Sequence, residues 1–435
     1  MRAQLTEELA ISRWWMCLCV SNEEVQLLAA DARMRGLSLL TVDGRPPFEF
    51  PCCDKRTGVS TRGELSSVSG GRTDTATLVL GDLRGIAKAG AAYVAWPSLE
   101  DPVLVASADC PKDRLLWFAT SMRRRVVGQA LRLGLTGERF WISGHRTPLV
   151  AETWTQITGH RASGVSVSNG TAGANRRPVA VVLDSSGNPT AFARSAYTPD
   201  EISALFSEVE LLSRLSEVAE LRESIPQVWG PCEVGEATVM YMKGQPGLVH
   251  GPKRLEDRHL AFLSALSLVD QQERALADSG PVRHASETLR HDRLSDVDRH
   301  IGERLLDGMD RGSIVTCRQH RDFTPWNTGI TRDGILYVYD WEYSRLGYPV
   351  THDLIHFASI RAVLRGSPPH RVIAVAHRAW ERCRSEHRPS FDTSMSLWLL
   401  DTWALYASAW AESPVGSRTV LDWLAACVEH LRGSR

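Results

Sequence analysis

The sequence predicts an α+β protein with two lobes, a small mixed β lobe followed by a larger helical lobe, and an α/β domain of unknown role before them. Strand and helix signals alternate over residues 1–150. Short β-type runs separated by turn residues dominate residues 151–245, and helical apolar periodicity dominates residues 246–435. A length of 435 residues suits two or three domains.

The composition is that of a soluble globular protein. Hydrophobic residues make up 43% of the chain and the formal net charge is -1, so nothing indicates a nucleic-acid or membrane partner. The nine cysteines lack paired zinc-type spacing. No stretch approaches the roughly 20 apolar residues of a membrane span. We expect a cytoplasmic protein, and the sequence leaves its oligomeric state open.

The N-terminal domain is predicted to alternate strands with helices. Helices are expected over residues 21–35 and 115–135, and strands within residues 36–42, 77–80, 92–97 and 102–106. Residues 43–75 are rich in Gly, Ser, Thr and Pro and are predicted to be loop. No G-x-G-x-x-G follows these strands, so no dinucleotide site is indicated.

The small lobe is predicted to contain two strands, a hairpin turn, a third strand, a helix and a closing strand. The strands are expected over residues 164–167, 178–183, 190–194 and 237–242, and the helix over residues 200–215. The helix signal is Thr198-Pro199-Asp200-Glu201, which places proline and acidic residues at its start.

The large lobe is predicted to be mainly helical. Helices are expected over residues 255–275, 294–309, 353–364, 370–384, 394–411 and 418–431. The tryptophans of the last three helices are interpreted as core residues.

The strongest functional signal lies between residues 314 and 357. His320, Asp322 and Asn327 form an H-x-D-x-x-x-x-N motif, and a predicted strand at residues 335–339 leads into Asp340. Phosphoryl transfer needs a carboxylate at the acceptor hydroxyl and oxygen ligands for the Mg²⁺ that bridges the nucleotide phosphates. The spacing places Asp322 and Asn327 on one loop, and the strand returns Asp340 towards it.

The motif HRDFTPWN followed by YDWE resembles the aminoglycoside phosphotransferase and choline kinase group of protein-kinase-like enzymes, over roughly residues 151–435. The resemblance implies that Asp322 is the catalytic base and that Asn327 and Asp340 hold magnesium. It implies that His320 orients the loop and that Asp353, in the later THDLIHF run, supports the site.

Three further features follow from this resemblance. Arg194 stands where the family has a lysine that pairs with the nucleotide phosphates, and Glu208 stands where its helix partner would be, with Glu210 as the alternative. The turn at residues 168–175 would cover the phosphates or be an ordinary hairpin turn.

Met240 and Met242 would line the adenine pocket or simply pack in the core. Arg321 stands where the dominant form of the group has glycine.

These observations predict an ATP-dependent, Mg²⁺-dependent kinase that phosphorylates a hydroxyl of a small molecule of the aminoglycoside, sugar or amino-alcohol type. The alternative is a pseudokinase that binds a nucleotide or a partner without turnover. The arginine at position 194 and the lack of G-x-G-x-x-G in the turn at residues 168–175 favour it, whereas the complete set of Asp322, Asn327 and Asp340 disfavours it. A third possibility places the main activity in residues 1–150. Nothing in the sequence identifies the acceptor.

Overall fold

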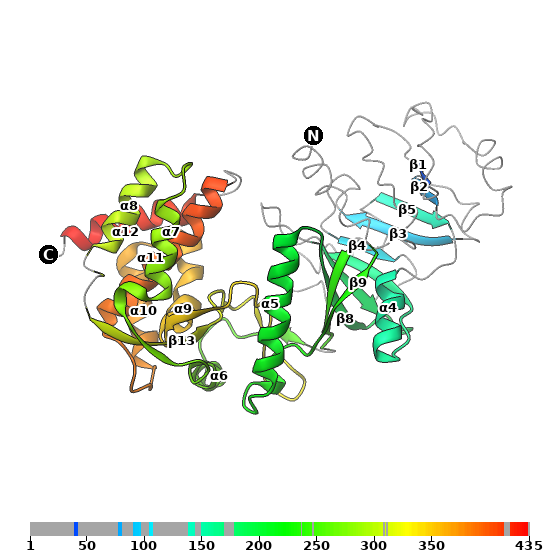
Figure 1. The fold of residues 1–435 in the computed structure, drawn as a ribbon, viewed down its shortest axis with the longest axis horizontal. Helices are drawn as coiled ribbons and strands as arrows, with labels where there is room; N and C mark the ends of the chain where they lie inside the picture. Colours follow the sequence, from blue (N-terminus) through cyan, green and yellow to red (C-terminus); the bar gives the residue numbers. More distant parts are fainter. Residues whose placement is uncertain are drawn as a thin grey trace. The chain divides into compact units, whose positions relative to one another are not determined.

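The computed structural model describes residues 39–41, 77–80, 90–96, 104–107, 138–143, 149–168, 178–235, 237–245, 248–307, 309, 312–412 and 418–433. The chain forms two compact units (Figure 1). The sheet unit contains Arg176–Val209, Val228–Pro246 and the segment before them, and the helical unit contains Glu210–Gln227 and Gly247–Arg435.

The sheet unit is built on one antiparallel sheet. Its strands are β1 (Leu39–Thr41), β2 (Thr77–Leu80), β3 (Gly90–Trp96), β4 (Leu104–Ser107), β5 (Glu138–Ser143), β6 (Gly164–Ser168), β7 (Val179–Leu183), β8 (Pro189–Ala196), β9 (Val228–Val234) and β10 (Ala237–Lys243). Their order in the sheet is β1-β2-β5-β3-β4-β6-β7-β8-β10-β9.

The segment before Leu149 supplies five of these strands, β1 to β5. The four strands predicted there are present as β1 to β4 with slightly different ends, and β5 was not predicted. The two predicted helices lie outside the described residues. All described pairs in this segment are antiparallel, and β4 continues into the next part of the sheet by pairing with β6. The described residues therefore give no support for an α/β organisation, and a separate domain ending near residue 150 remains a prediction.

The small lobe of the sheet unit follows the predicted order, with two additions. Helix α5 (Pro199–Ser216) is confirmed, and helix α4 (Leu149–Thr158) was not predicted. The hydroxyl of Tyr241 donates to the Val150 carbonyl at 2.9 Å and thereby ties α4 to β10. Strand β9 was missed because Gly230 and Pro231 argue against a strand. A Cβ atom at Gly230, where φ is 99°, would lie 2.8 Å from the Val239 carbonyl oxygen, so glycine is required there.

The helical unit combines helices with two short sheets. The helices are α6 (Asp257–Ser267), α7 (Gly280–Leu289), α8 (Asp296–Leu306), α9 (His352–Leu364), α10 (Pro369–Glu381), α11 (Phe391–Glu412) and α12 (Thr419–Gly433), with 3-10 turns at Arg222–Ser224 and Leu276–Asp278. One sheet has the order β11 (Val249–His250), β14 (Thr328–Ile330), β15 (Leu336–Val338), and the other has the order β12 (Gln272–Ala275), β13 (Ser313–Gln319), β16 (Arg345–Pro349).

The long helix predicted over residues 255–275 is wrong in its second half. Helix α6 ends at Ser267, Asp270 adopts a positive φ of 58°, and residues 272–275 form strand β12 against β13. The apolar stripe that suggested a single helix stops at Val269, and the polar run after it gains its hydrogen bonds from the neighbouring strand. Helix α7 was also not predicted.

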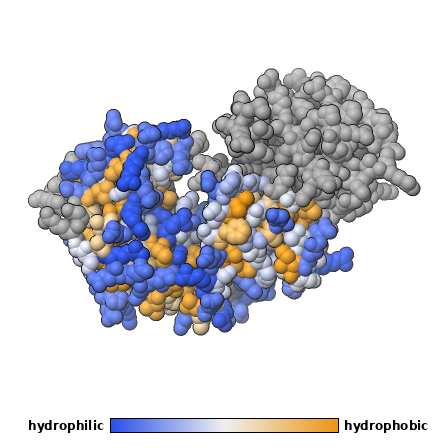
Figure 2. Space-filling model, in the orientation of Figure 1, coloured by the Kyte–Doolittle hydropathy of each residue, from blue (hydrophilic) through white to orange (hydrophobic). Residues whose placement is uncertain are grey.

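The core of the helical unit lies around α11. Trp398 and Trp403 are fully buried and Trp423 of α12 is 5% exposed, which confirms these tryptophans as core residues. Figure 2 shows hydrophilic side chains over much of the visible face of this unit, with apolar residues in smaller patches between them. Among the described residues, the helices are too short or too polar to cross a bilayer.

Candidate active site

The predicted catalytic loop, residues 320–327, connects β13 to β14. The side-chain amide of Asn327 donates to Oδ2 of Asp322 at 2.6 Å and to the Asp322 carbonyl at 3.0 Å. Asn327 is buried, whereas the side chain of Asp322 is 27% exposed. Asn327 therefore fixes one carboxylate oxygen of Asp322 while this side chain stays accessible to solvent.

A hairpin returns Asp340 to the same loop. Strands β14 and β15 pair antiparallel with Thr328 opposite Val338, and the N–H of Tyr339 donates to the Asn327 carbonyl at 3.1 Å. Asp340, which adopts a positive φ of 70°, follows directly. The Asn327 amide and the Asp340 carboxylate thus come from adjoining positions at one end of the hairpin. Both offer oxygen atoms, the ligands that Mg²⁺ prefers, so these residues fit a magnesium site.

His320 is the first residue of the loop and is fully buried. Its Nδ1 accepts the Asp322 N–H at 3.3 Å and its Nε2 lies 3.1 Å from the Tyr339 carbonyl. Burial lowers the pKa of His320 despite the nearby charges of Asp353 and Asp322. A neutral ring with its proton on Nε2 satisfies both contacts. This ring ties the catalytic loop to Tyr339, the residue between β15 and Asp340.

Asp353, in the first turn of α9, holds the start of the loop. Its carboxylate accepts the backbone N–H groups of His320 at 2.6 Å and Arg321 at 2.8 Å. Burial acts to raise the pKa of Asp353, but the neighbouring His352, whose Nδ1 lies 3.5 Å from Oδ1, outweighs it, and the pKa is lowered. The carboxylate therefore stays charged and braces two successive peptide groups.

Arg321 has a backbone conformation that favours glycine, with φ at 68°. An L-residue there is disfavoured by about 1–2 kcal/mol. Its guanidinium is buried and forms two hydrogen bonds to Asp401 of α11, at 2.6 Å from Nη2 and 3.2 Å from Nε. It also lies over the Tyr348 ring at 4.8 Å. These contacts compensate for the backbone strain and link the catalytic loop to the core helix.

Asp401 is the centre of a buried polar network. Besides Arg321, it lies within hydrogen-bond distance of Tyr348 Oη at 3.0 Å, His352 Nε2 at 3.0 Å and His284 Nδ1 at 2.9 Å. Burial acts to raise its pKa, but the Arg321 charge and the hydrogen bonds from the histidines hold the pKa well below the usual range. Burial acts to lower the pKa of His352, but the neighbouring carboxylates of Asp353 and Asp401 prevail and raise it.

Arg194 and Glu208 form the predicted ion pair within the sheet unit. Nη1 of Arg194, on β8, lies 3.0 Å and 2.9 Å from the two carboxylate oxygens of Glu208, on α5. Both side chains are largely buried, at 11% and 5% exposure. Glu210, the alternative partner, is exposed. The pairing is observed, and a phosphate-binding role remains a prediction.

Met240 is fully buried and packs with Ala196 and Leu205 between the sheet and α5. This is the core packing that the sequence left open. Met242 is half-buried beside the same cluster. An adenine-binding role for either residue stays a prediction, and most of the predicted phosphate turn lies outside the described residues.

Sequence reasoning missed Asp401 and His356. Asp401 interrupts the apolar run Leu397–Leu400, and a carboxylate on the buried face of such a helix usually has a structural partner. His356 lies one turn after His352 on α9, so the spacing of the two histidines would have placed them on one face.

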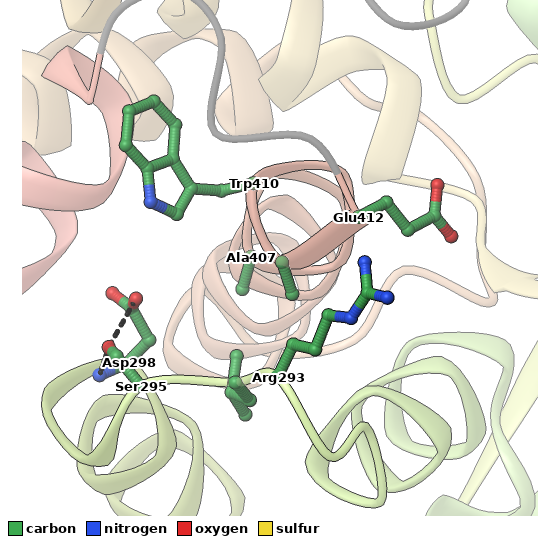
Figure 3. A pocket seen from close by; sticks show the side chains of 8 residues that line it. Arg293, Ser295, Asp298, Ala407, Trp410 and Glu412 are labelled. Carbon is green, nitrogen blue, oxygen red and sulfur yellow. Dashed lines mark hydrogen bonds between the residues drawn. The ribbon is translucent and has the colours of Figure 1, made fainter. Parts of the chain in front are cut away.

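A cavity of about 360 Å³ lies elsewhere in the helical unit (Figure 3). It is lined by Arg293, Leu294, Ser295, Asp298, Ala407, Trp410, Ala411 and Glu412. Its buried carboxylate, Asp298, already accepts from Ser295 at 2.6 Å and from Arg418 at 2.7 Å. None of the predicted site residues lines this cavity, so the candidate active site is the loop around Asp322.

Residues 172–386 match the model of the phosphotransferase enzyme family. No curated protein matches the chain.

Similar solved structures include three enzymes. Choline kinase LicA from Streptococcus pneumoniae has 12% identity and a TM-score of 0.45, covering 66% of this chain and 98% of that chain. Macrolide 2'-phosphotransferase MphH from Brachybacterium faecium has 18% identity and a TM-score of 0.41, covering 61% and 98%. A thermostable mutant of aminoglycoside phosphotransferase APH(4)-Ia, in a ternary complex with ADP and hygromycin B, has 15% identity and a TM-score of 0.39, covering 64% and 98%.

The family match lies inside the range over which the sequence resembles these kinases. It contains the catalytic loop, the Asp340 hairpin and the Arg194–Glu208 pair. Residues 172–386 of this chain belong to the phosphotransferase enzyme family.

Proposed function

We propose that the protein transfers the γ-phosphoryl group of ATP to a hydroxyl of a small molecule of the aminoglycoside, sugar or amino-alcohol type. The observation that supports this best is the convergence of Asp322, Asn327 and Asp340 on one loop and hairpin. Two buried residues hold this assembly through hydrogen bonds, His320 within the loop and Asp353 on α9. Such bracing suits a reaction whose catalysis rests on positioning and charge neutralisation.

Asp322 is assigned to the acceptor. Its Oδ2 is bonded to Asn327, so Oδ1 is the oxygen that receives or orients the hydroxyl proton. Asn327 and Asp340 would hold the Mg²⁺, which neutralises charge on the phosphate oxygens. In the sheet unit, Arg194 is assigned to the nucleotide phosphates and Glu208 to orienting Arg194. A planar guanidinium binds phosphate and carboxylate groups well, although its geometry differs from that of lysine.

The test is transfer from radiolabelled ATP across a panel of amino alcohols, sugars and aminoglycosides. With the best acceptor, Asp322→Asn should lower kcat by roughly 10²–10⁴-fold, because the amide cannot take the proton. Nucleotide affinity, measured by calorimetry, should stay near the wild-type value. Asp333→Asn, at an exposed turn position of the same hairpin, is the matched control and should retain full activity. An Asp322→Asn variant with most of its activity would contradict the assigned role.

The pseudokinase alternative is favoured by two features, the arginine at position 194 and the lack of G-x-G-x-x-G in the turn at residues 168–175. It predicts that ATP binds without transfer to any acceptor and without hydrolysis. Binding with no turnover, in a protein whose Asp322→Asn variant behaves identically, would favour this alternative over a kinase.

A further inference from the structure

His356 approaches the carboxylate oxygen of Asp322 that Asn327 leaves unoccupied. Asn327 donates to Oδ2 at 2.6 Å, and the Nε2 atom of His356 lies 3.7 Å from Oδ1. The imidazole is 6% exposed, and its ring lies nearly parallel to that of His352, with an interplanar angle of 6°. The two oxygens of the proposed base therefore face two different side chains, one from the loop and one from α9.

Trp398 decides which nitrogen of His356 carries the proton. The indole Nε1 of Trp398 lies 3.2 Å from Nδ1 of His356. An indole N–H can only donate, so Nδ1 must accept. A neutral imidazole whose Nδ1 accepts has its hydrogen on Nε2, the atom that faces Asp322. Trp398 is fully buried in the helical core.

We propose that His356 is a positioning residue for Asp322, with its Nε2–H directed at Oδ1 and its tautomer fixed by Trp398. This inference rests on the proposed function for its catalytic consequence. The 3.7 Å separation is longer than a hydrogen bond, and catalytic hydrogen bonds of ligand-free sites commonly shorten in the reactive complex. Asp322, which is partly exposed, closes this gap when the acceptor binds. Its carboxylate plane is then held by two donors, one on each oxygen.

The tautomer also decides which group takes the acceptor proton. Nε2 of His356 already carries a hydrogen, so this atom cannot remove a proton from a hydroxyl. The remaining lone pair on Oδ1 of Asp322 stays the only base at this position. His356 thus directs the carboxylate without competing with it.

Two substitutions separate the two ends of the imidazole. His356→Gln retains an amide donor near the Nε2 position, whereas His356→Asn retains an oxygen that can accept from Trp398 but has no donor near Asp322. We expect kcat of His356→Asn to fall by roughly 10–10²-fold, with the KM for ATP unchanged, because a misplaced catalytic group costs about that much. His356→Gln should restore most of this loss.

The control pair is His377→Asn and His377→Gln on the exposed side of α10, which should leave kcat unchanged. Equal losses in His356→Asn and His356→Gln at equal thermal stability would overturn the proposal. So would wild-type kcat in His356→Asn.

A second measurement does not depend on turnover. Long-range ¹H–¹⁵N correlation spectra of the ¹⁵N-histidine-labelled protein report the tautomer of each ring, and the His356→Gln spectrum identifies the signals of His356. We expect a proton on Nε2 in the wild type and loss of this preference in Trp398→Phe. A proton on Nδ1 in the wild type overturns the proposal whether or not transfer is seen. An Nε2 proton without any transfer would instead refute the proposed function and leave the pairing of His356 with Asp322 intact.

Discussion

Replacing Asp401 with asparagine would test whether the buried network holds the catalytic loop. The change keeps the shape of the side chain and removes its charge. Asp401 is 3% exposed and lies within 3.2 Å of polar atoms on Arg321, Tyr348, His352 and His284. The substitution leaves the buried Arg321 guanidinium without its carboxylate and adds an amide N–H where donors already converge.

Breaking a buried ion pair from one side costs about 3–5 kcal/mol. At about 2–4 °C per kcal/mol for a unit of this size, the melting temperature should fall by about 6–20 °C. Thermal melting followed by far-ultraviolet circular dichroism measures the fall in melting temperature, and urea titration measures the loss in free energy of unfolding. Asp422→Asn is the control, because its 3.6 Å pair with Arg418 is exposed and such pairs contribute about 0–1 kcal/mol. If Asp401→Asn costs no more than Asp422→Asn, the network does not hold the loop.

Three further predictions concern the metal, the nucleotide and pH. Asp340→Ala should weaken Mg²⁺-dependent ATP binding in calorimetry and make it insensitive to chelator, and undiminished sensitivity to chelator would count against Asp340 as a ligand. Arg194→Lys keeps the charge but loses the contacts of Nη1 with both oxygens of Glu208, so ATP affinity or transfer should fall, and a gain of activity would support the pseudokinase alternative. Folding raises the pKa of His352, so the protonated imidazole stabilises the folded state. This contribution is complete at pH values below the unfolded-state pKa of about 6.5 and is lost as the pH rises through the folded-state pKa. The stability difference between wild type and His352→Gln should therefore shrink towards alkaline pH in urea titrations, and a difference that grows would refute the assignment.

The sequence alone determined much of the local structure and the identity of the catalytic loop. The spacing from His320 to Asn327 and the strand before Asp340 are local features, since a loop and a hairpin bring together residues that are close in the chain. The family match confirms the resemblance drawn from them. Helices such as α5, α10 and α12 were predictable because their apolar periodicity is sustained over several turns.

Tertiary structure decided the parts that depend on distant partners. Residues 272–275 became a strand because β13, about forty positions later, offers them hydrogen bonds. Strand β9 was not predicted because it contains Gly230 and Pro231, and it forms through antiparallel pairing with β10. The sequence was equally consistent with Met240 in the core and with Met240 in an adenine pocket, and its buried neighbours show that it packs in the core.

The residues that hold the catalytic loop in place were the hardest to predict from the sequence. Arg321 could be recognised as a departure from glycine, but its partner Asp401 lies 80 positions away on α11. Trp398 and His356 likewise lie 42 positions apart. No periodicity encodes such pairs, because a buried charge or a ring nitrogen is satisfied by whichever group packing brings within hydrogen-bond distance. The sequence therefore determined which residues can perform the chemistry, and only the packing of α9 and α11 against the loop determined how those residues are held.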